Sequence, residues 1–353
     1  MDYDYLIVGQ GLAGTSLAWH LHQCGKKFLI VNDSTRPAAS LVAAGIFNPL
    51  TGRKLVKTWL ADELFPYARR FYGELEETLQ ARFLHYINIY RPYRSVEEQN
   101  SYLAQTAEPG IGPYIQQPPA NLPYNDYLYA PHGGLEVTGS GWVDLPLFLL
   151  KSQEYFQQGG QYREGFFNPD DMVLSGDTVE WNGLRIGKVI FCQGVDALSN
   201  TLFNWLPFNP VKGQILEIAL DKYPIDRIVN QGIFILPDGE GKCRLGATYS
   251  WHDLDWETTE EGRQYLEEKA KGVLKVPYQV LKQRAGLRPS SKDRRPLVGF
   301  HPQFQQVGVF NGLGTKGVTL APYFAANLVE YMEKGKDLNL LVNIGRYFSL
   351  YYQ

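Results

Sequence analysis

The first thirty residues contain two apolar runs separated by a glycine turn and an amphipathic stretch. The run 3–8 predicts a buried strand, and the spacing of leucines and small residues over 12–23 predicts a helix. Gly25 is placed to end that helix, and residues 28–31 predict a second strand. A strand, a helix and a further strand in this order predict a parallel sheet.

Helical and strand-like patterns alternate along the rest of the chain. Helical spacing returns at 58–82, 145–158, 260–274 and 319–331, strand-like runs occupy 214–219, 232–236 and 243–247, and the Pro- and Gly-rich stretch 107–141 predicts loops and short strands. We therefore predict an α/β (α+β) fold, with a Rossmann-like nucleotide-binding domain and an interleaved antiparallel-sheet substrate domain. The predicted nucleotide-binding domain comprises 1–80, 140–210 and 285–353, and the predicted substrate domain comprises 81–139 and 211–284.

Composition and charge exclude several classes of protein. The 353 residues carry 34 Lys and Arg against 37 Asp and Glu, a net charge of −3, which gives no overall attraction to nucleic acid or anionic lipid. Cys24, Cys192 and Cys243 are too few for a disulfide framework. We expect no signal peptide, and the sequence has no apolar run of the roughly 20 residues that a membrane span needs. We expect a cytoplasmic protein without a membrane partner.

A glycine motif lies between the first predicted strand and helix. Gly9, Gly11 and Gly14 enclose Gln10, Leu12 and Ala13 in the pattern GxGxxG. In this pattern the first glycine permits a tight turn, the second lets the backbone approach a pyrophosphate, and the third allows close helix–strand packing. The helix N-terminus adds the positive end of its dipole. The motif in this context predicts dinucleotide binding.

The end of the second predicted strand is the expected place for a group that binds ribose hydroxyls, about 20 residues after the motif. Asn32 and Asp33 occupy this position. A carboxylate can accept hydrogen bonds from both hydroxyls, whereas an amide accepts one and donates another. The alternative is that the two residues only cap a turn. No Arg follows directly to hold a 2′-phosphate, which disfavours NADP.

Segments in several parts of the chain form a recognisable set: 9–14, 39–49, 141–144, 189–194, 286–299 and 312–322. Together they resemble the D-amino-acid oxidase and glycine oxidase family of FAD-dependent oxidoreductases. The last two are similar to the FAD domain of the bifunctional enzyme that oxidises a carboxymethylaminomethyl group on tRNA wobble uridine. The family has Glu or Asp where Asn32 stands, so ribose binding is expected to pass partly to Asp33. No cysteine lies near 312–317, so the resemblance implies non-covalent FAD.

The resemblance implies a set of further cofactor-binding residues. They are Ser40, Ala44, Gly45, Gly194, Gly312, Gly314, Thr315, Lys316 and Gly317. Ser40 is expected to donate to a phosphate, Ala44 and Gly45 to pass over the flavin ring, and the glycines of 312–317 to present N–H groups to the ring edge. A cation there favours flavin reduction, and Lys316 is a candidate. The alternatives are plain turns and a solvated lysine.

Arg288 is the charge on which the substrate assignment rests. It lies among apolar strand residues in the sequence Gly-Leu-Arg-Pro, where a buried guanidinium needs an anionic partner. The resemblance implies that this partner is a substrate carboxylate, and Tyr249 is a second candidate for the same contact. The alternatives are an internal ion pair for Arg288 and simple packing for Tyr249. We assign no metal site, because none of the six histidines has a second ligand at metal spacing. We name no catalytic acid or base, because the expected oxidation requires none beyond loss of the ammonium proton.

Three functions agree with these residues. The first is an FAD-dependent oxidoreductase that oxidises the C–N bond of an amine or amino acid, with dioxygen as acceptor. The second performs the same chemistry on tRNA, with a basic patch formed by 52–57, Arg69 and Arg70. Against it stand the acidic overall charge and the common occurrence of solvated basic helix faces. The third is a flavin-binding scaffold without turnover.

Overall fold

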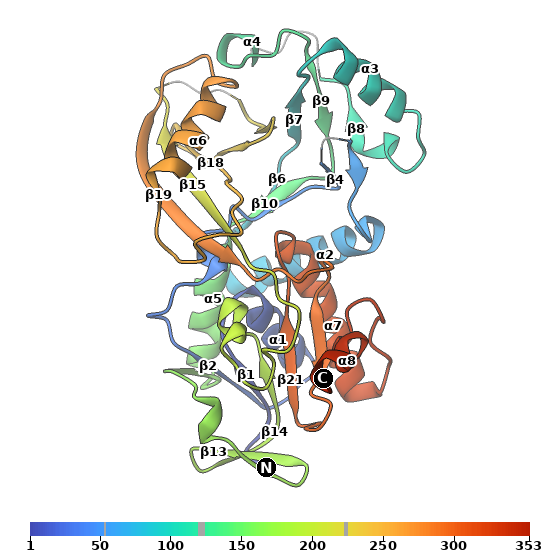
Figure 1. The fold of residues 1–353 in the computed structure, drawn as a ribbon, viewed down its shortest axis with the longest axis vertical. Helices are drawn as coiled ribbons and strands as arrows, with labels where there is room; N and C mark the ends of the chain where they lie inside the picture. Colours follow the sequence, from blue (N-terminus) through green and yellow to red (C-terminus); the bar gives the residue numbers. More distant parts are fainter. Residues whose placement is uncertain (53, 119–123, 222–224) are drawn as a thin grey trace.

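The fold is described from a computed structural model that covers residues 1–353 except 53, 119–123 and 222–224. Two large sheets are separated along the long axis of the molecule, with both chain termini in the half that contains the first sheet (Figure 1). The expected mixture of helices and parallel and antiparallel strands is confirmed. The predicted domain boundaries stay a prediction.

The first sheet has a parallel centre and antiparallel additions. Its parallel strands are, in order, β11 (Tyr162–Glu164), β2 (Phe28–Asn32), β1 (Tyr3–Val8), β14 (Leu184–Phe191) and β21 (Val307–Asn311). Antiparallel neighbours are β13 (Thr178–Trp181), β12 (Val173–Ser175) and β20 (Leu297–Phe300). β1 lies between β2 and β14, so the turn that follows it opens at the carboxyl edge of the parallel strands. Ligands bind at this edge in open α/β sheets.

Alternate side chains of the central strand enter two separate cores. Tyr5 and Ile7 face the helices, whereas Leu6 and Val8 face a second apolar cluster. The helical core is formed by α1 (Leu12–Gln23), α2 (Ala61–Leu79), α5 (Leu145–Gln158) and α7 (Gly317–Lys334). This period of two places β1 as a strand buried on both faces, as expected for the centre of a parallel sheet.

The second sheet is almost entirely antiparallel. Its order is β19 (Gln279–Arg288), β15 (Val211–Ala219), β18 (Lys242–Gly246), β17 (Phe234–Pro237), β16 (Ile228–Asn230), β7 (Ile89–Pro92), β9 (Gly134–Val137) and β8 (Ile115–Gln116). Only the β16–β7 pair among these is parallel. Helix α6 (Glu260–Lys271) covers part of this sheet and is capped by the Thr259 hydroxyl, which accepts from the Gly262 N–H at 3.1 Å.

Small elements complete the fold. β3 (Ile46–Phe47), β10 (Gly141–Val143) and β6 (Leu84–Tyr86) form a three-stranded sheet, and β4 (Leu50–Thr51) pairs with β5 (Val56–Lys57). The remaining helices are α3 (Val96–Gln105), α4 (Tyr124–Tyr127) and α8 (Phe348–Tyr351), with 3₁₀ turns η1 (Ala39–Leu41), η2 (Gly112–Tyr114), η3 (Pro169–Asp171), η4 (Gly194–Leu198) and η5 (Ile344–Tyr347).

The sequence prediction was correct for α1 and α5 at both ends and wrong in extent elsewhere. The helix predicted over 58–82 is shorter, because Leu60 (φ 51°) and Gln80 (φ 49°) adopt left-handed backbone angles that bound α2. The helix predicted over 319–331 begins earlier, at Gly317, and continues to Lys334. The short helix α8 follows it in the chain.

The first sheet meets the second through the strand that ends at Arg288. A Cβ on Gly286 would come within 3.2 Å of the Val42 side chain, and the Arg284 guanidinium donates to the Leu41 carbonyl at 2.9 Å. The end of β19 therefore packs directly on the segment that follows η1. This contact places Arg288 beside the cofactor loops predicted from the sequence.

Candidate active site

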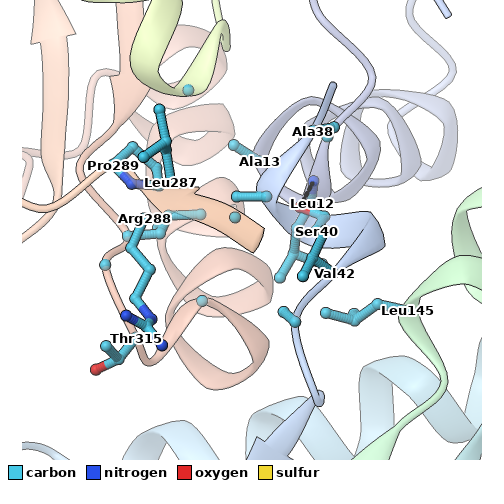
Figure 2. A pocket seen from close by; sticks show the side chains of 18 of the residues that line it. Leu12, Ala13, Ala38, Ser40, Val42, Leu145, Leu287, Arg288, Pro289 and Thr315 are labelled. Atoms are coloured by element: carbon cyan, nitrogen blue, oxygen red, sulfur yellow. Dashed lines mark hydrogen bonds between the residues drawn. The ribbon is translucent and has the colours of Figure 1, made fainter. Parts of the chain in front are cut away.

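One long pocket lies between the two sheets. Its walls come from the turn after β1, the end of β2, the η1 segment, the turn at Gly194, strands β15 and β19, and the loop before α7. Figure 2 shows Leu12, Ala13 and Ser40 on one side of this space, with Leu287, Arg288 and Pro289 opposite. Sixteen of the eighteen predicted site residues line it, all except Gly14 and Gly312. These two glycines lie behind the wall.

The glycine motif has the close contacts that its pattern predicts. Gly9 has φ 98°, and a Cβ there would approach the Cys192 carbonyl oxygen to 2.8 Å. A Cβ on Gly14 would lie 1.9 Å from the Gly9 carbonyl oxygen, so Gly14 permits the packing of α1 against the turn. The Leu12 N–H at the start of α1 donates to the Ser40 hydroxyl at 3.1 Å. That hydroxyl keeps its own proton for an acceptor in the pocket.

At the end of β2 the two predicted ribose ligands have different surroundings. The Asn32 amide oxygen accepts from the Gln10 N–H at 2.9 Å, and its NH₂ donates to the Tyr162 hydroxyl at 3.4 Å. Asn32 thus ties the glycine turn to the first sheet. The Asp33 carboxylate accepts from the Thr35 N–H at 3.0 Å and keeps acceptor capacity toward the pocket.

Arg36 follows Asp33 closely in the sequence and also lines the pocket. The sequence analysis did not assign it a role. Its guanidinium pairs with Asp196 at 3.1 Å and lies over the Phe166 ring, 5.5 Å from the centroid. Burial raises the pKa of Asp196, and Asp33 raises it further while Arg36 lowers it. Arg36 is therefore already matched by a carboxylate.

The middle of the pocket is lined by backbone. Gly45 (φ 71°) lies so close to β10 that a Cβ would meet the Val143 carbonyl oxygen at 1.9 Å. Gly194 (φ 57°) has nothing within 4 Å of the Cβ position, so its open face borders the pocket. The Asn311 amide holds this turn by donating to the Gly194 carbonyl at 2.8 Å and accepting from the Gly312 N–H at 2.8 Å. Gly312 thus shapes the loop from behind.

The pocket has the donor set that FAD requires. A helix N-terminus with a glycine turn suits the pyrophosphate, a carboxylate at the end of β2 suits the ribose, and bare backbone at Gly45, Gly194 and Gly314 leaves room for a flat ring. Cys192 also lines this space, but its side chain belongs to the apolar core, where burial raises the pKa of the thiol and so holds it protonated. A protonated thiol is a poor nucleophile for covalent attachment.

Arg288 ends β19 with its guanidinium in the pocket, and Figure 2 shows it extending toward Thr315. Its hydrogen bond to protein is a 3.4 Å contact to the Thr248 carbonyl, and its Cζ lies 4.5 Å from the centroid of the Tyr249 ring. Burial lowers the pKa of Arg288. The internal ion pair considered as the alternative is not seen in the part of the chain that the structure describes. Tyr249, 58% exposed, contacts the cation through its ring.

Lys316 directly precedes α7 and also lines the pocket. Its ammonium donates to the Thr58 hydroxyl at 3.5 Å, and that hydroxyl donates to the Asn48 carbonyl at 2.9 Å. Burial lowers the pKa of Lys316, and the positive charges of Arg295 and Arg294 lower it further. Lys316 is therefore a partly buried cation beside other cations, not a freely solvated side chain.

Sequence reasoning missed several lining residues. They are Asn48, Thr58, Gly213, Asn230, Trp256, Arg36 and Asp196. Trp256 belongs to the segment after Tyr249, which is anchored by an ion pair between the buried Lys212 and Asp255. No local pattern marks these positions, because each reaches the pocket through the pairing of distant strands or loops.

Three of the residues proposed for a basic patch have partners within the protein, whereas Lys54 is exposed. Lys57 pairs with Asp62 at 2.6 Å, Arg69 donates to the Gly139 carbonyl at 2.8 Å, and Arg70 lies over the Tyr67 ring. Arg53 lies outside the described residues. The described part of the chain contains no group of three or more His, Cys, Asp or Glu arranged to hold a metal ion. Nor does any of its helices have the length and hydropathy to cross a bilayer.

Comparison with known proteins agrees with this geometry. The chain is 23% identical to glycine oxidase from Bacillus licheniformis, over 91% of this chain and 90% of that protein. It is 27% identical to the tRNA 5-methylaminomethyl-2-thiouridine biosynthesis bifunctional protein of Chromohalobacter salexigens, over 83% of this chain but only 45% of that protein.

Solved structures show the same fold. Glycine oxidase from Bacillus cereus superposes with a TM-score of 0.78 at 21% identity, covering 96% of this chain and 97% of that one. Iminodiacetate oxidase from Chelativorans sp. BNC1 gives 0.77 at 22% identity, covering 97% and 98%. The family described as FAD dependent oxidoreductase matches residues 4–331. The expected resemblance and the FAD cofactor are thereby confirmed, and the chain belongs to this family of FAD-dependent oxidoreductases.

Proposed function

We propose that the protein oxidises the C–N bond of an amine that carries a carboxylate, with non-covalently bound FAD. The observation that carries the proposal is Arg288, a partly buried cation that lines the pocket without a carboxylate partner among the described residues. A buried charge without a partner costs several kcal/mol in general, and a bound carboxylate would remove that cost. The names of relatives that oxidise glycine or iminodiacetate support this class of substrate.

FAD, when bound, supplies the acceptor for the hydride that leaves the substrate α carbon, at ring atom N5. The chain's own part begins with Arg288, whose planar guanidinium can hold a carboxylate by two parallel hydrogen bonds and so fix the direction of the α C–H bond. Gly213 leaves the space that this guanidinium occupies. The ring of Tyr249 packs against the same guanidinium.

The substrate must lose its ammonium proton before hydride can leave, and the charges of the pocket favour that loss. Positive charge at Arg288 and Lys316 destabilises a nearby ammonium ion and thereby lowers the pKa of the amine. The carboxylates among the described lining residues are Asp33 and Asp196, of which Asp196 is paired with Arg36, and neither His nor Glu is among these lining residues. We therefore propose no carboxylate or imidazole base for this step. In the overall reaction, amine, dioxygen and water give a carbonyl compound, the released amine and hydrogen peroxide.

The direct test is an anaerobic screen of glycine, N-methyl amino acids and other amines against the purified flavoprotein. Oxidation of a substrate bleaches the flavin absorbance, and admission of dioxygen should restore it with formation of peroxide. Bleaching by carboxylated amines and not by their decarboxylated analogues supports the proposal. If no amine bleaches the flavin, the scaffold hypothesis replaces it.

A second candidate keeps the chemistry and places the amine on tRNA. It rests on the similarity to the bifunctional tRNA-modifying relative. Against it, Lys57, Arg69 and Arg70 of the proposed basic patch have partners within the protein. Filter binding of tRNA over a salt series distinguishes the two, because contacts to phosphates give an affinity that falls steeply with salt. Absence of binding at low salt removes this candidate.

A further inference from the structure

The strands of the second sheet contribute an almost entirely apolar wall to the pocket. Among the described lining residues that belong to these strands, only Arg288 and Asn230 have polar side chains. Arg288 is the proposed carboxylate anchor. A few polar groups on an apolar wall fix the orientation of a ligand in most binding pockets. Asn230 is therefore a candidate for a second contact to the substrate.

Asn230 ends β16 and faces the pocket. Two residues earlier, Ile228 belongs to an apolar cluster that also contacts Phe234, whereas Val229 belongs to the cluster that packs against α6. Alternate residues of a strand point to opposite faces of the sheet, so Asn230 shares the face of Ile228. Asn230 also pairs directly with Phe234, which is itself a lining residue.

The side-chain amide of Asn230 forms no hydrogen bond within the part of the chain that the structure describes. An asparagine beside a turn commonly bonds a backbone group within two residues. Here the turn closes through the backbone instead, because the Gln231 N–H donates to the Ile233 carbonyl at 3.0 Å. The partly buried amide of Asn230 is thus free to contact a ligand in the pocket.

An apolar strip leads across the sheet to Asn230. In the strand register, Ile215 pairs with Gly246, and Gly246 pairs with Phe234. Phe234 in turn pairs with Asn230, so the strip and the amide lie in one row. A Cβ on Gly246 would lie 2.6 Å from Cγ2 of Ile215 and 3.0 Å from Cε1 of Phe234. The two apolar side chains therefore close over this glycine.

This row sets the distance between the two polar groups. Strands β18 and β17 separate β15 from β16, which places β15 and β16 about 14 Å apart at the usual strand spacing of about 4.8 Å. The Arg288 guanidinium packs on Gly213 of β15. After the reach of both side chains, a carboxylate on Arg288 and a group bonded to Asn230 are on the order of 10 Å apart. Glycine and iminodiacetate are too short to contact both residues.

We propose that Asn230 binds the far end of an elongated substrate, an amino acid with an arm of about 10 Å that ends in a neutral amide. This inference rests on the proposed function and narrows its substrate class. The Asn230 side chain can donate to the carbonyl of such an amide and accept from its NH₂, whereas a carboxylate only accepts. The apolar strip suits the hydrocarbon part of the arm. An arm on the amine nitrogen and an arm on the α carbon make the same contacts, and the experiment distinguishes them.

The test combines two ligands with two proteins. N-(5-carbamoylpentyl)glycine carries the amide at the proposed distance, and N-(6-methylheptyl)glycine replaces it by an isopropyl group of the same shape. The ratio of their kcat/KM values should fall about tenfold from wild type to Asn230→Leu, as expected for two neutral hydrogen bonds. Asn230→Ala, which adds no volume, should lower the ratio likewise. Asn100→Leu is the matched control, because Asn100 is exposed on α3 and outside the pocket lining.

Arm length and attachment are tested with the same variants. N-(carbamoylmethyl)glycine and N-isobutylglycine form a matched pair whose arms are too short to reach Asn230, so their kcat/KM ratio should not change. A second pair carries the amide or the isopropyl group on a six-methylene side chain at the α carbon. The long series in which the ratio depends on Asn230 identifies the attachment point.

A binding measurement separates this inference from the proposed function. (5-Carbamoylpentylthio)acetate and (6-methylheptylthio)acetate have the same arms but no amine to oxidise. Titration of the flavin absorbance should show the same fall of about tenfold in their affinity ratio in Asn230→Leu. If no amine bleaches the flavin but this pattern holds, the amide contact stands while the proposed function fails.

The opposite results overturn the inference. If glycine bleaches the flavin but the ratio in every long series is the same in wild type, Asn230→Leu and Asn230→Ala, the proposed function stands and Asn230 does not bind the substrate. A fall of equal size in Asn100→Leu, or in the short pair, would show that the effect does not come from a contact at the end of the arm.

Discussion

The guanidinium of Arg288 occupies the space that a side chain at Gly213 would fill. A Cβ at residue 213 would lie 2.1 Å from Nη2 and 2.3 Å from Nη1 of Arg288. Gly213 pairs with Gly286 across the β15–β19 ladder, two residues before Arg288. The guanidinium thus packs directly on the backbone of β15. The position of the proposed carboxylate anchor therefore depends on residue 213 having no side chain.

Gly213→Ala should therefore disturb the anchor without changing its charge. The new methyl group must displace the guanidinium, so we expect kcat/KM for carboxylated amines to fall by about 30- to 1000-fold, as for the loss of a bidentate contact worth roughly 2–4 kcal/mol. Steady-state kinetics and the FAD absorbance of the same preparation measure this. Gly73→Ala on α2 is the control, because nothing lies within 4 Å of its Cβ position. Unchanged kinetics in Gly213→Ala would show that the guanidinium moves without consequence.

Arg288→Lys keeps the positive charge but loses the planar fork. We expect a loss of about 2–4 kcal/mol in transition-state stabilisation, or roughly 30- to 1000-fold in kcat/KM. Amines without a carboxylate should gain relative to amino acids. Because Arg288 forms no ion pair among the described residues, melting temperature and FAD content should stay near wild type. Uniform destabilisation with unaltered substrate preference would contradict the anchor and return Arg288 to a structural role.

The relationship between Gly213 and Arg288 also shows which contacts the sequence cannot predict. The glycine motif, α1 and Gly25 could be predicted because their contacts are local, within one strand–turn–helix unit. The space at Gly213 and the contact between Thr58 and Lys316, 258 residues apart, arise only when distant strands and loops pair. Ser40 was assigned from resemblance alone, and its contact to the Leu12 N–H adds a helix-capping role that no spacing indicates.

Asn32 and Asp33 should differ in how they affect FAD. Loss of both side chains in the Asn32→Ala/Asp33→Ala double variant should weaken FAD binding by about 1–3 kcal/mol, the value of roughly two hydrogen bonds. Asp33→Ala alone should account for the ribose part, because the Asn32 amide is already bonded to the Gln10 N–H. Equilibrium dialysis of FAD measures both. Tyr162→Phe removes the 3.4 Å partner of Asn32 together with the hydrogen bond that the Tyr162 hydroxyl donates to Glu164, and it should bind FAD like wild type. Equal FAD affinity in the double variant would place the acceptor elsewhere.

The FAD should be non-covalent. Cys192 lines the pocket, but burial raises the pKa of its thiol and keeps it protonated. Cys24 and Cys243 are not among the lining residues. Acid precipitation should therefore release the yellow chromophore into the supernatant, where its spectrum identifies FAD. A yellow pellet, or a colourless protein that binds only NAD, would contradict this prediction.

Stability should fall in mild acid because of two buried histidines. Burial lowers the pKa of His20 to about 4, and the same cause lowers the pKa of His301 to about 4. The His20 ring contacts the Tyr67 hydroxyl at 3.0 Å through Nε2, and burial outweighs the opposing effect of the Pro322 backbone carbonyl on the pKa of this ring. Both rings are therefore neutral in the folded state at pH 5, whereas an unfolded histidine with a pKa of about 6.5 is protonated there.

The unfolded state thus binds more protons, and the free energy of unfolding rises with pH in this window. The contribution of these residues is complete above about pH 6.5 and is lost as the pH falls to about 4, with a slope of up to about 1.4 kcal/mol per pH unit for each histidine. Urea unfolding of the flavoprotein at pH 7, 6 and 5 measures the slope. His20→Gln should reduce this slope by the contribution of one titrating histidine. His252→Gln, at an exposed position, should leave the slope unchanged. An equal slope in wild type and His20→Gln would show that His20 is already protonated in the folded protein.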